Sequence, residues 1–344
     1  MRDIARAAGV SLITVSRALN PAAAHRVQAR TRAKIERLAA ARGYRVNQFA
    51  RALRSGRGHT LALVLPASRH FAASEYYARI IFSIISAAHA AQYDVKVHVM
   101  HFGESPRRHL MRPDESGADG VIYVGFGADL APALRLADGA VPAVLMNSIA
   151  MRGRHSVDAD NECGGRMAAE CLLAHGHRRL SVLAGPAGSQ NAHDRVRGFA
   201  SALAAGGVRL APGRTMHSAF GISEGRHAAE LLLQRFARIS AFFCANDELA
   251  IGALQAVQAR GLRCPADLSI IGFDNITATA LTTPPLTTIE QPVGDMSTRC
   301  VETVLQLIAH ASPPVRQLFP VRLVMRGSVA AYPRGAPQRS SVHR

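Results

Sequence analysis

The feature that most restricts the fold of this chain is a regular alternation of short apolar runs and longer amphipathic stretches, which begins at Thr60. Residues 60–65 form an apolar run of strand length, and residues 76–92 then repeat isoleucine at the spacing of a helix face. The same rhythm predicts strands at 94–101, 120–124, 141–146, 179–184, 241–244 and 268–272, and helices at 162–175, 192–205, 222–236, 247–260 and 293–310. Such alternation is typical of parallel, doubly wound sheets covered by helices. Strand-like pieces at 316–319 and 323–326 bring the total to about a dozen strands, too many for one comfortable sheet, so we expect two similar lobes.

The first 58 residues differ from the rest of the chain in charge. The 344 residues carry a formal net charge of +17, and residues 1–58 hold 13 Lys and Arg against only Asp3 and Glu36. An arginine-rich genome explains part of the basic count, but it does not explain why acidic residues are scarce in one segment. A concentrated positive field attracts a polyanion, and nucleic acid is the partner that fits it best.

Residues 3–20 have the pattern of two short helices joined by a tight turn. Gly9 suits the turn because glycine adopts positive φ freely, and the Ser11 hydroxyl can cap the second helix. With Val15 and Leu19 facing inward, the second helix presents an outer face to the major groove of DNA, formed by Leu12, Ile13, Ser16 and Arg17. A third helix at about 28–42 closes a small all-α core.

A fourth short helix is predicted at 47–54, with Asn47 as its N-cap and Leu53 on its apolar side. A helix of this length with two apolar positions is not stable alone, so we expect it to form only against DNA and a second copy of the chain.

Features of other protein classes are missing from the sequence. The five cysteines have no close paired spacing and suggest reduced thiols of a cytoplasmic protein, without a signal peptide or a membrane span. A glycine pair at 125 and 127 follows a strand, but Leu130 breaks the dinucleotide fingerprint. Nucleophile-elbow, P-loop and metal-spaced histidine motifs are also lacking, so we expect neither an enzyme nor a metal or cofactor site.

Polar and aromatic residues gather where the predicted strands end. Because ligands of parallel sheets sit beyond the carboxyl ends of the strands, these residues are expected to converge on a cleft between the lobes. They are Tyr76, Tyr77, Asn147, Asp158, Asp160, Ser189, Asn191, Arg195, Phe220, Asn246, Asp247, Asp274 and Asn275. Amides, carboxylates, one Arg and aromatic rings suit a sugar-like polyol. Alternatives remain for four of them, since Asp160 and Asp247 could only cap helices, Arg195 could be a surface residue and Phe220 could be core.

The motifs resemble those of the lactose-repressor (LacI/GalR) family. The resemblance rests on Val10-Ser11-x-x-Thr14-Val15-Ser16-Arg17-Ala18-Leu19-Asn20, Arg195-x-x-Gly198-Phe199, Ala245-Asn246-Asp247, Ile271-Gly-Phe-Asp-Asn275 and Pro285-Leu-Thr-Thr-Ile-Glu-Gln-Pro292. It extends from Met1 to about Ala331 and implies a two-lobed fold of the type I periplasmic-binding-protein kind. It also implies that the effector cleft is lined by Tyr76, Tyr77, Asn147, Ser189, Asn191, Arg195, Phe220, Asn246 and Asp274.

The DNA contacts follow partly from chemistry and partly from this resemblance. Arg17 can bind guanine O6 and N7 with two donors, whereas Ser11, Thr14, Ser16 and Asn20 suit phosphate contacts. Leu12 and Ile13 either meet thymine methyl groups or pack against the third helix, and the resemblance makes them the main base-reading pair. The resemblance also makes Leu53 a wedge that opens a minor-groove step, which implies a homodimer on a near-palindromic operator of double-stranded DNA.

The expected organisation has four parts. They are a helix-turn-helix headpiece at 1–46, a hinge helix and linker at 47–58, an effector-binding and dimerisation domain at 59–332, and a basic flexible tail at 333–344. Lobe 1 takes about 59–159 plus 290–320, and lobe 2 about 160–289 plus 321–332.

Three departures from the family pattern qualify this expectation. Helix one begins almost at Met1, so either its cap is weak or the true start lies upstream. Asn147 stands where many sugar-binding members carry Asp, which leaves the ligand class open. The tail has no heptads, so a tetrameric coiled coil is not expected.

The sequence thus predicts a bacterial-type cytoplasmic repressor controlled by a small sugar-like effector. A transport-type sugar-binding protein and a nonspecific DNA-compacting protein are the rival readings. The basic head argues against the first, and the polar cleft argues against the second.

Overall fold

The computed structural model describes residues 1–19, 23–44, 58–67, 71, 73–100, 117–126, 141–148, 153–236 and 238–332. The chain divides into two compact units, Met1–Gly58 and His59–Arg344. The boundary falls where the sequence changes from the basic segment to the strand–helix alternation. The predicted hinge helix at 47–54, with Asn47 and Leu53, lies outside the described residues, as do Asn20 and the tail at 333–344.

The first unit is a small bundle of short helices, α1 (Arg2–Ala8), α2 (Leu12–Ala18), the 3₁₀ turn η1 (Ala24–Arg26) and α3 (Ala29–Ala41). Gly9 ends α1 at φ 72°, a left-handed conformation that glycine adopts without strain. The buried core joins all three α-helices through Ile4, Val15 and Ile35. The predicted helix-turn-helix with its closing third helix is therefore present.

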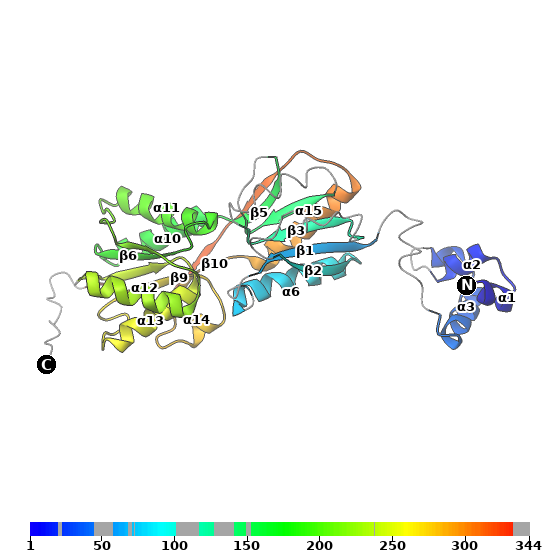
Figure 1. Ribbon diagram of the computed structural model, residues 1–344, viewed down its shortest axis with the longest axis horizontal. Helices are drawn as coiled ribbons and strands as arrows, with labels where there is room; N and C mark the ends of the chain where they lie inside the picture. The colour runs from blue at the N-terminus through cyan, green and yellow to red at the C-terminus, as the bar shows by residue number, and fades with distance from the viewer. Residues whose placement is uncertain are drawn as a thin grey trace. The chain divides into compact units, whose positions relative to one another are not determined.

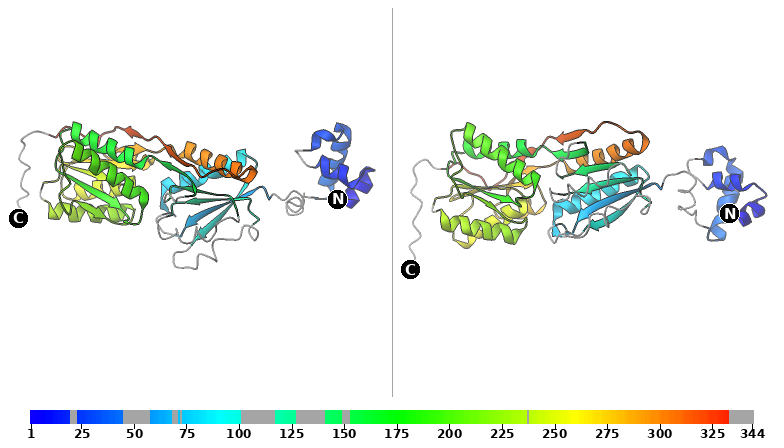
Figure 2. Two further views of the ribbon diagram at one scale, coloured as in Figure 1. Left: turned by 90° about the horizontal axis from the view of Figure 1, so that it is seen from above. Right: turned by 45° about the horizontal axis from the view of Figure 1, so that its top comes forward.

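The second unit contains two six-stranded sheets, and the described helices pack on both faces of the lobe 2 sheet and on one face of the lobe 1 sheet, as Figures 1 and 2 show. The sheet of lobe 1 is parallel throughout and has the order β11 (Arg316–Phe319), β5 (His155–Ala159), β4 (Ala143–Met146), β3 (Gly120–Val124), β1 (Thr60–Pro66) and β2 (Asp94–Met100). Helices α6 (Glu75–Ala90) and α15 (Val293–Ala309) pack against each other and against this sheet. Their inner faces are apolar, with Ile80, Ile84 and Val304 fully buried.

The sheet of lobe 2 has the order β12 (Arg322–Val324), β10 (Thr287–Glu290), β9 (Ser269–Asp274), β8 (Ala241–Cys244), β6 (Leu180–Gly185) and β7 (Thr215–His217). Only β12 runs antiparallel to its neighbour. Helices α10 (Asn161–Ala174) and α11 (Gln190–Ala205) pack as one pair, and α12 (Ile222–Arg235) and α13 (Asp247–Ala259) as another. The two pairs cover opposite faces of the sheet (Figure 1). A short helix, α14 (Ala278–Leu281), follows β9.

Three crossovers join the lobes within the described residues. The chain passes from β5 to α10, from β10 to α15 and from β11 to β12. Each lobe is therefore built from separated stretches of sequence, and the carboxyl ends of both sheets face a shared cleft.

Within the described residues, the predicted strands and helices are confirmed to within a few residues, and the two-lobed α/β class is confirmed with them. The sequence did not predict β5, β7, β10 or α14 as regular elements. Asp158, expected after a short extended piece, lies inside β5. In the described part of the chain, no helix is long and apolar enough to cross a bilayer.

Candidate ligand cleft and nucleic-acid interface

A cavity of about 1350 Å³ lies between the carboxyl ends of the two sheets. Nine of the thirteen residues expected there line it, namely Tyr76, Tyr77, Asn147, Ser189, Asn191, Arg195, Phe220, Asn246 and Asp274. They come from both lobes. Each lies at the end of a strand, in the loop that follows it, or in the first two turns of the next helix. The geometry therefore brings the predicted set together around one space large enough for a small molecule.

Four of the expected residues do not line the cavity, namely Asp158, Asp160, Asp247 and Asn275. For Asp160 the expectation that it faces the cleft is wrong. It is the N-cap of α10, and its Oδ1 accepts a hydrogen bond of 2.9 Å from the amide of Cys163. It lines a separate groove between α10 and α11. Its carboxylate is held by the first turn of its own helix, which is the capping alternative that the sequence left open.

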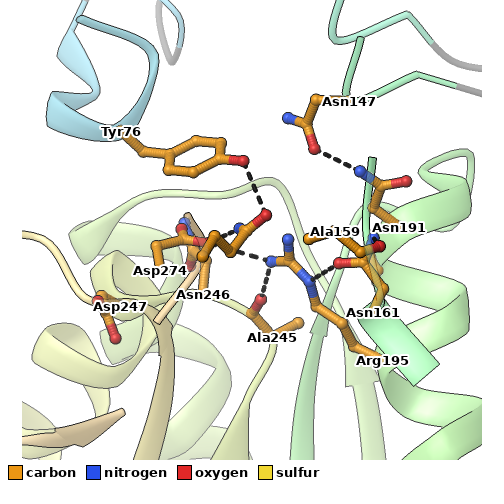
Figure 3. A network of polar contacts seen from close by, with 12 residues as sticks. Tyr76, Asn147, Ala159, Asn161, Asn191, Arg195, Ala245, Asn246, Asp247 and Asp274 are labelled. Atoms are coloured by element: carbon orange, nitrogen blue, oxygen red, sulfur yellow. Dashed lines mark hydrogen bonds and ion pairs between the residues drawn. The ribbon is translucent and has the colours of Figure 1, made fainter. Parts of the chain in front are cut away.

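Arg195 lies at the centre of the polar network shown in Figure 3. It is only 4 % exposed, so it is a cleft residue and not a surface residue. Its Nε donates to Asn161 Oδ1 at 2.7 Å, and its Nη1 donates to the carbonyl of Ala245 at 2.6 Å and lies 3.4 Å from Asp274 Oδ1. The guanidinium also stacks on the Phe273 ring at 3.8 Å. These contacts hold the floor of the cleft rigid in lobe 2.

Two sets of hydrogen bonds connect the lobes across the cleft. Asn191 of α11 donates to Asn147, which follows β4 in lobe 1 (Figure 3). It also donates to Asp158 Oδ1 of β5 at 3.2 Å. On the other side, the Tyr76 hydroxyl donates to Gln291 Oε1 at 2.9 Å, and Gln291 Nε2 donates to Asp274 Oδ1 at 2.6 Å. A ligand that inserted between these groups would have to replace bonds that now hold the lobes together.

Asp158 is a buried carboxyl group beside the cleft. Its Oδ1 accepts bonds from the Ala159 amide at 2.8 Å and from Asn161 Nδ2 at 3.2 Å. Burial raises the pKa of Asp158 to about 7, although these bonds and the nearby Arg195 charge act in the opposite direction. The protonation of this group therefore changes near neutral pH.

Aromatic rings cover both sides of the cleft. Phe71 stacks on Tyr77 with ring centroids 3.7 Å apart in lobe 1. Gly125 follows β3 at φ 77°, and a Cβ there would lie 2.2 Å from Phe71 Cζ. In lobe 2, Gly185 ends β6 at φ 72°, and a Cβ there would lie 2.4 Å from Phe220 Cε1. Glycine at each strand end thus makes room for a ring, and Phe220 is a cleft residue more than a core residue.

Sequence reasoning missed several residues that line the cleft, including Phe71, Phe126, Gln190 and Gln255. The glycines that end β3 and β6 were the available signal for the rings, because a glycine directly after a buried strand often marks a close approach. The amides of Gln190 and Gln255 sit on helices and carry no such signal.

Asp247 does not cap α13, which was the alternative that the sequence left open for it. Asn246 is the N-cap of α13, since its Oδ1 accepts from the Leu249 amide at 2.9 Å. The fully buried Asp247 accepts from the Ile276 amide at 2.9 Å and from Thr288 Oγ1 at 2.5 Å. Burial raises its pKa well above the ordinary value, and Asp274 adds to the effect. Asp247 thereby anchors the segment after β9, where Asp274 and Asn275 both have positive φ.

The outer face of α2 is exposed as predicted. Ser11 caps the helix, with its Oγ 3.1 Å from the Thr14 amide. Leu12 is 44 % exposed and Ile13 is 64 % exposed, so neither is buried against α3. Arg17 is exposed on the same face, while Thr14 and Ser16 are half-buried. Two apolar side chains and a guanidinium therefore stand on a basic headpiece, as a reader of base edges requires.

The described residues contain no cluster of three His, Cys, Asp or Glu side chains suited to hold a metal ion. The five cysteines are free thiols. The polar groups of the cleft are amides, hydroxyls, carboxylates and guanidinium groups, so the arrangement is one for binding a small molecule.

The chain is similar to known proteins in both of its parts. The family of bacterial regulatory proteins called lacI matches residues 1–47, and the periplasmic binding protein-like domain matches residues 169–329. The ribose operon repressor of Haemophilus influenzae is 30 % identical over 325 residues, which cover 92 % of this chain and 94 % of that protein.

Solved structures show the same likeness. A lac repressor dimer bound to operator and the anti-inducer ONPF has a TM-score of 0.84 at 28 % identity, covering 96 % of this chain and 98 % of that one. A complex of the transcriptional regulator CelR with cellobiose has a TM-score of 0.74 at 27 % identity, covering 94 % of this chain and 98 % of that one.

Proposed function

Because this chain belongs to the LacI family of bacterial regulatory proteins, we propose that it represses transcription from a near-palindromic operator under the control of a small sugar-like effector. Like its relatives, it is a DNA-binding transcriptional regulator and not an enzyme. The observation that carries the proposal is the pairing of an exposed reading helix with a two-lobed cleft of about 1350 Å³ lined by amides and aromatic rings.

In this proposal α2 enters the major groove. Arg17 binds a guanine, and the exposed Leu12 and Ile13 contact thymine methyl groups. Ser11, Thr14, Ser16 and Asn20 bind phosphates, and Asn47 and Leu53 belong to a hinge helix that forms on the operator. Phosphate contacts give affinity, while the three exposed side chains of α2 give sequence preference.

The effector occupies the cleft between the lobes. Aromatic rings cover its apolar faces, and amides and Arg195 fix its hydroxyl groups. Support comes from the structures of relatives, one holding cellobiose and another the anti-inducer ONPF. Closure of the lobes around the effector changes the spacing of two hinge helices, so that binding in the cleft alters operator affinity through a coupling free energy.

A homodimer is part of the proposal because a near-palindrome presents two equal half-sites. Lobe 1 carries exposed apolar side chains on α6 and on the neighbouring strand β2, namely Phe82, Ile85, Val97 and Val99. We assign this surface to the second copy of the chain. A regulator of this kind acts in the cytoplasm, where the chromosome is.

The experiment that tests DNA reading selects duplexes from a random pool with the purified protein and then measures the affinity of Arg17→Ala for the selected sequence. Loss of a two-donor contact to guanine should reduce discrimination against other bases at that position by about 1–3 kcal/mol. Unchanged selectivity refutes the role of Arg17. Absence of any selected sequence, at every salt concentration, refutes specific DNA binding itself.

The experiment that tests the cleft uses an effector found by thermal-shift screening. Asp274→Ala removes a carboxylate that Arg195 and Gln291 both contact. We expect operator binding to persist and the response of operator affinity to the effector to disappear. A normal response in a gel-shift titration rules out Asp274 as an effector residue.

A further inference from the structure

The sign of the charge in the cleft is opposite to that of the whole chain. The chain has a net charge of +17 and a pI of about 11.0. The lining of the cleft nevertheless has more carboxylates than guanidinium groups. The carboxylates belong to Glu75, Glu224, Glu248 and Asp274, and the guanidinium groups to Arg195 and Arg226. A basic protein that bound an anionic effector would not need an acidic cleft.

Both guanidinium groups of the lining are compensated by carboxylates. Arg226 lies 2.9 Å from Glu230. Arg195 lies 3.4 Å from Asp274, and its Nε and Nη1 already donate to Asn161 and Ala245. A phosphate or carboxylate that took Arg195 as its partner would leave Asp274 buried without its counter-charge, which is costly.

Acidic residues of the chain itself also stand in the first turns of helices that begin at the cleft. Helix N-termini carry partial positive charge and would otherwise attract an anion. Glu75 stands in the first turn of α6, Glu224 in that of α12 and Glu248 in that of α13. The remaining one, α11, has no acidic residue in its first turn, but its N-cap Ser189 accepts from the Ala192 amide. The acidic residues in these first turns offset the positive ends of their helices, so an anionic group would be attracted less strongly there.

The rest of the lining suits an uncharged ring. It consists of carboxamides, hydroxyls and aromatic rings, among them Asn147, Gln190, Gln255, Ser148, Phe71 and Phe220. A carboxamide both donates and accepts, so it can bind a sugar hydroxyl or the edge of a base, and a ring can cover a flat apolar face.

From these features we infer that the cleft binds an uncharged ring compound and rejects its phosphorylated or carboxylate-bearing counterpart. The inference rests on the proposed function, because it names the class of effector that the same cleft accepts. It also names the residues that cause the discrimination against anionic compounds, namely the carboxylates in the first turns of α6, α12 and α13.

The test measures matched pairs by titration calorimetry on the full-length protein. The pairs are ribose and ribose 5-phosphate, glucose and glucose 6-phosphate, glucose and gluconate, and adenosine and its 5′-monophosphate. We expect at least one uncharged member to bind, and to bind roughly tenfold or more tightly than its anionic partner, as one unit charge about 12 Å away at an effective dielectric constant of about 20 implies. The difference should shrink as salt is added.

A variant that removes one carboxylate of the cleft tests whether the cleft causes the discrimination against anionic compounds. Glu248→Gln should reduce the discrimination against the anionic member by about tenfold, because one of the repelling charges is gone. Glu170→Gln makes the same charge change on an exposed ion pair of α10, which lines the other groove, and should leave discrimination unchanged.

Two results overturn the inference. One is an anionic member that binds as tightly as its uncharged partner, and the other is a panel in which no uncharged compound binds. Neither result touches operator selection, which tests the proposed DNA-binding function separately. Failure of the inference and failure of the function are therefore distinguishable.

Discussion

At the scale of single residues, the cleft is organised by buried polar groups that bind one another and the backbone. Arg195 lies between amide, carbonyl and carboxylate acceptors, and Asp158 and Asp247 bind backbone amides. Their identities as polar residues after strands were visible in the sequence. Their partners were not, because Asn161, Gln291 and Thr288 come from other elements and only the fold brings them near.

The raised pKa of Asp158 predicts a pH dependence of stability. From about pH 4 to about pH 7 the carboxyl group is ionised in the unfolded chain but protonated in the folded one. The folded state binds more protons in that window, so the free energy of unfolding should fall as pH rises, by roughly 1.4 kcal/mol per pH unit. Asp158→Asn should remove this contribution, as measured by denaturant unfolding at several pH values.

The control is Asp295→Asn, which removes an exposed carboxylate at the start of α15. It should leave the pH slope as it is in the wild type. A slope in Asp158→Asn equal to that of the wild type would show that the carboxyl group is ionised in the folded protein throughout this range.

At the scale of elements, the sequence predicted most of the strands but missed β5 and β10, whose buried side chains are largely polar. β5 reads His-Ser-Val-Asp-Ala and is buried along its whole length. β10 reads Thr-Thr-Ile-Glu, and its threonine hydroxyls are buried against Asp247 and the amide of Arg326. Hydrogen bonds to distant residues replace apolar packing in these strands, and no periodicity in the sequence reports such bonds.

The cap of α2 supports a prediction at this scale. Ser11 Oγ accepts from the Thr14 amide at 3.1 Å and lies 2.9 Å from Thr14 Oγ1. Ser11→Ala leaves that amide without its acceptor, so the headpiece should lose about 1 kcal/mol of stability. Calorimetry of the full chain should show the headpiece transition at lower temperature, and Ser11→Asp, which retains a capping oxygen, should restore it. Equal transitions in all three proteins would mean that the cap contributes nothing.

At the scale of the whole molecule, the number of lobes, their parallel sheets and the place of the cleft followed from the strand–helix alternation. What could not be predicted was which side chains of the outer surface remain exposed. Ile85 belongs to the isoleucine pattern of its helix, yet it is 38 % exposed. Helical spacing identifies an apolar side chain, but it does not say whether the covering partner is the same chain or another one.

The proposed homodimer can be tested on that surface. Phe82→Glu places a charge in the apolar surface of α6 and β2, so two copies should separate and operator affinity should fall. Sedimentation equilibrium measures the first effect and a gel-shift titration the second. Val315→Glu, at a side chain 47 % exposed just before β11, is the matched control and should remain a dimer. A Phe82→Glu protein that stays dimeric places the interface elsewhere.

The three crossovers between the lobes set the order in which the protein is completed during synthesis. Lobe 1 begins with β1 but needs α15 and β11, which are among the last parts to leave the ribosome. The headpiece and most of lobe 2 emerge earlier and can fold while the nascent chain is still growing. The sheet that starts first is thus finished almost last, and a truncated message that stops after residue 290 yields a chain with a DNA-reading head and an unfinished lobe behind it.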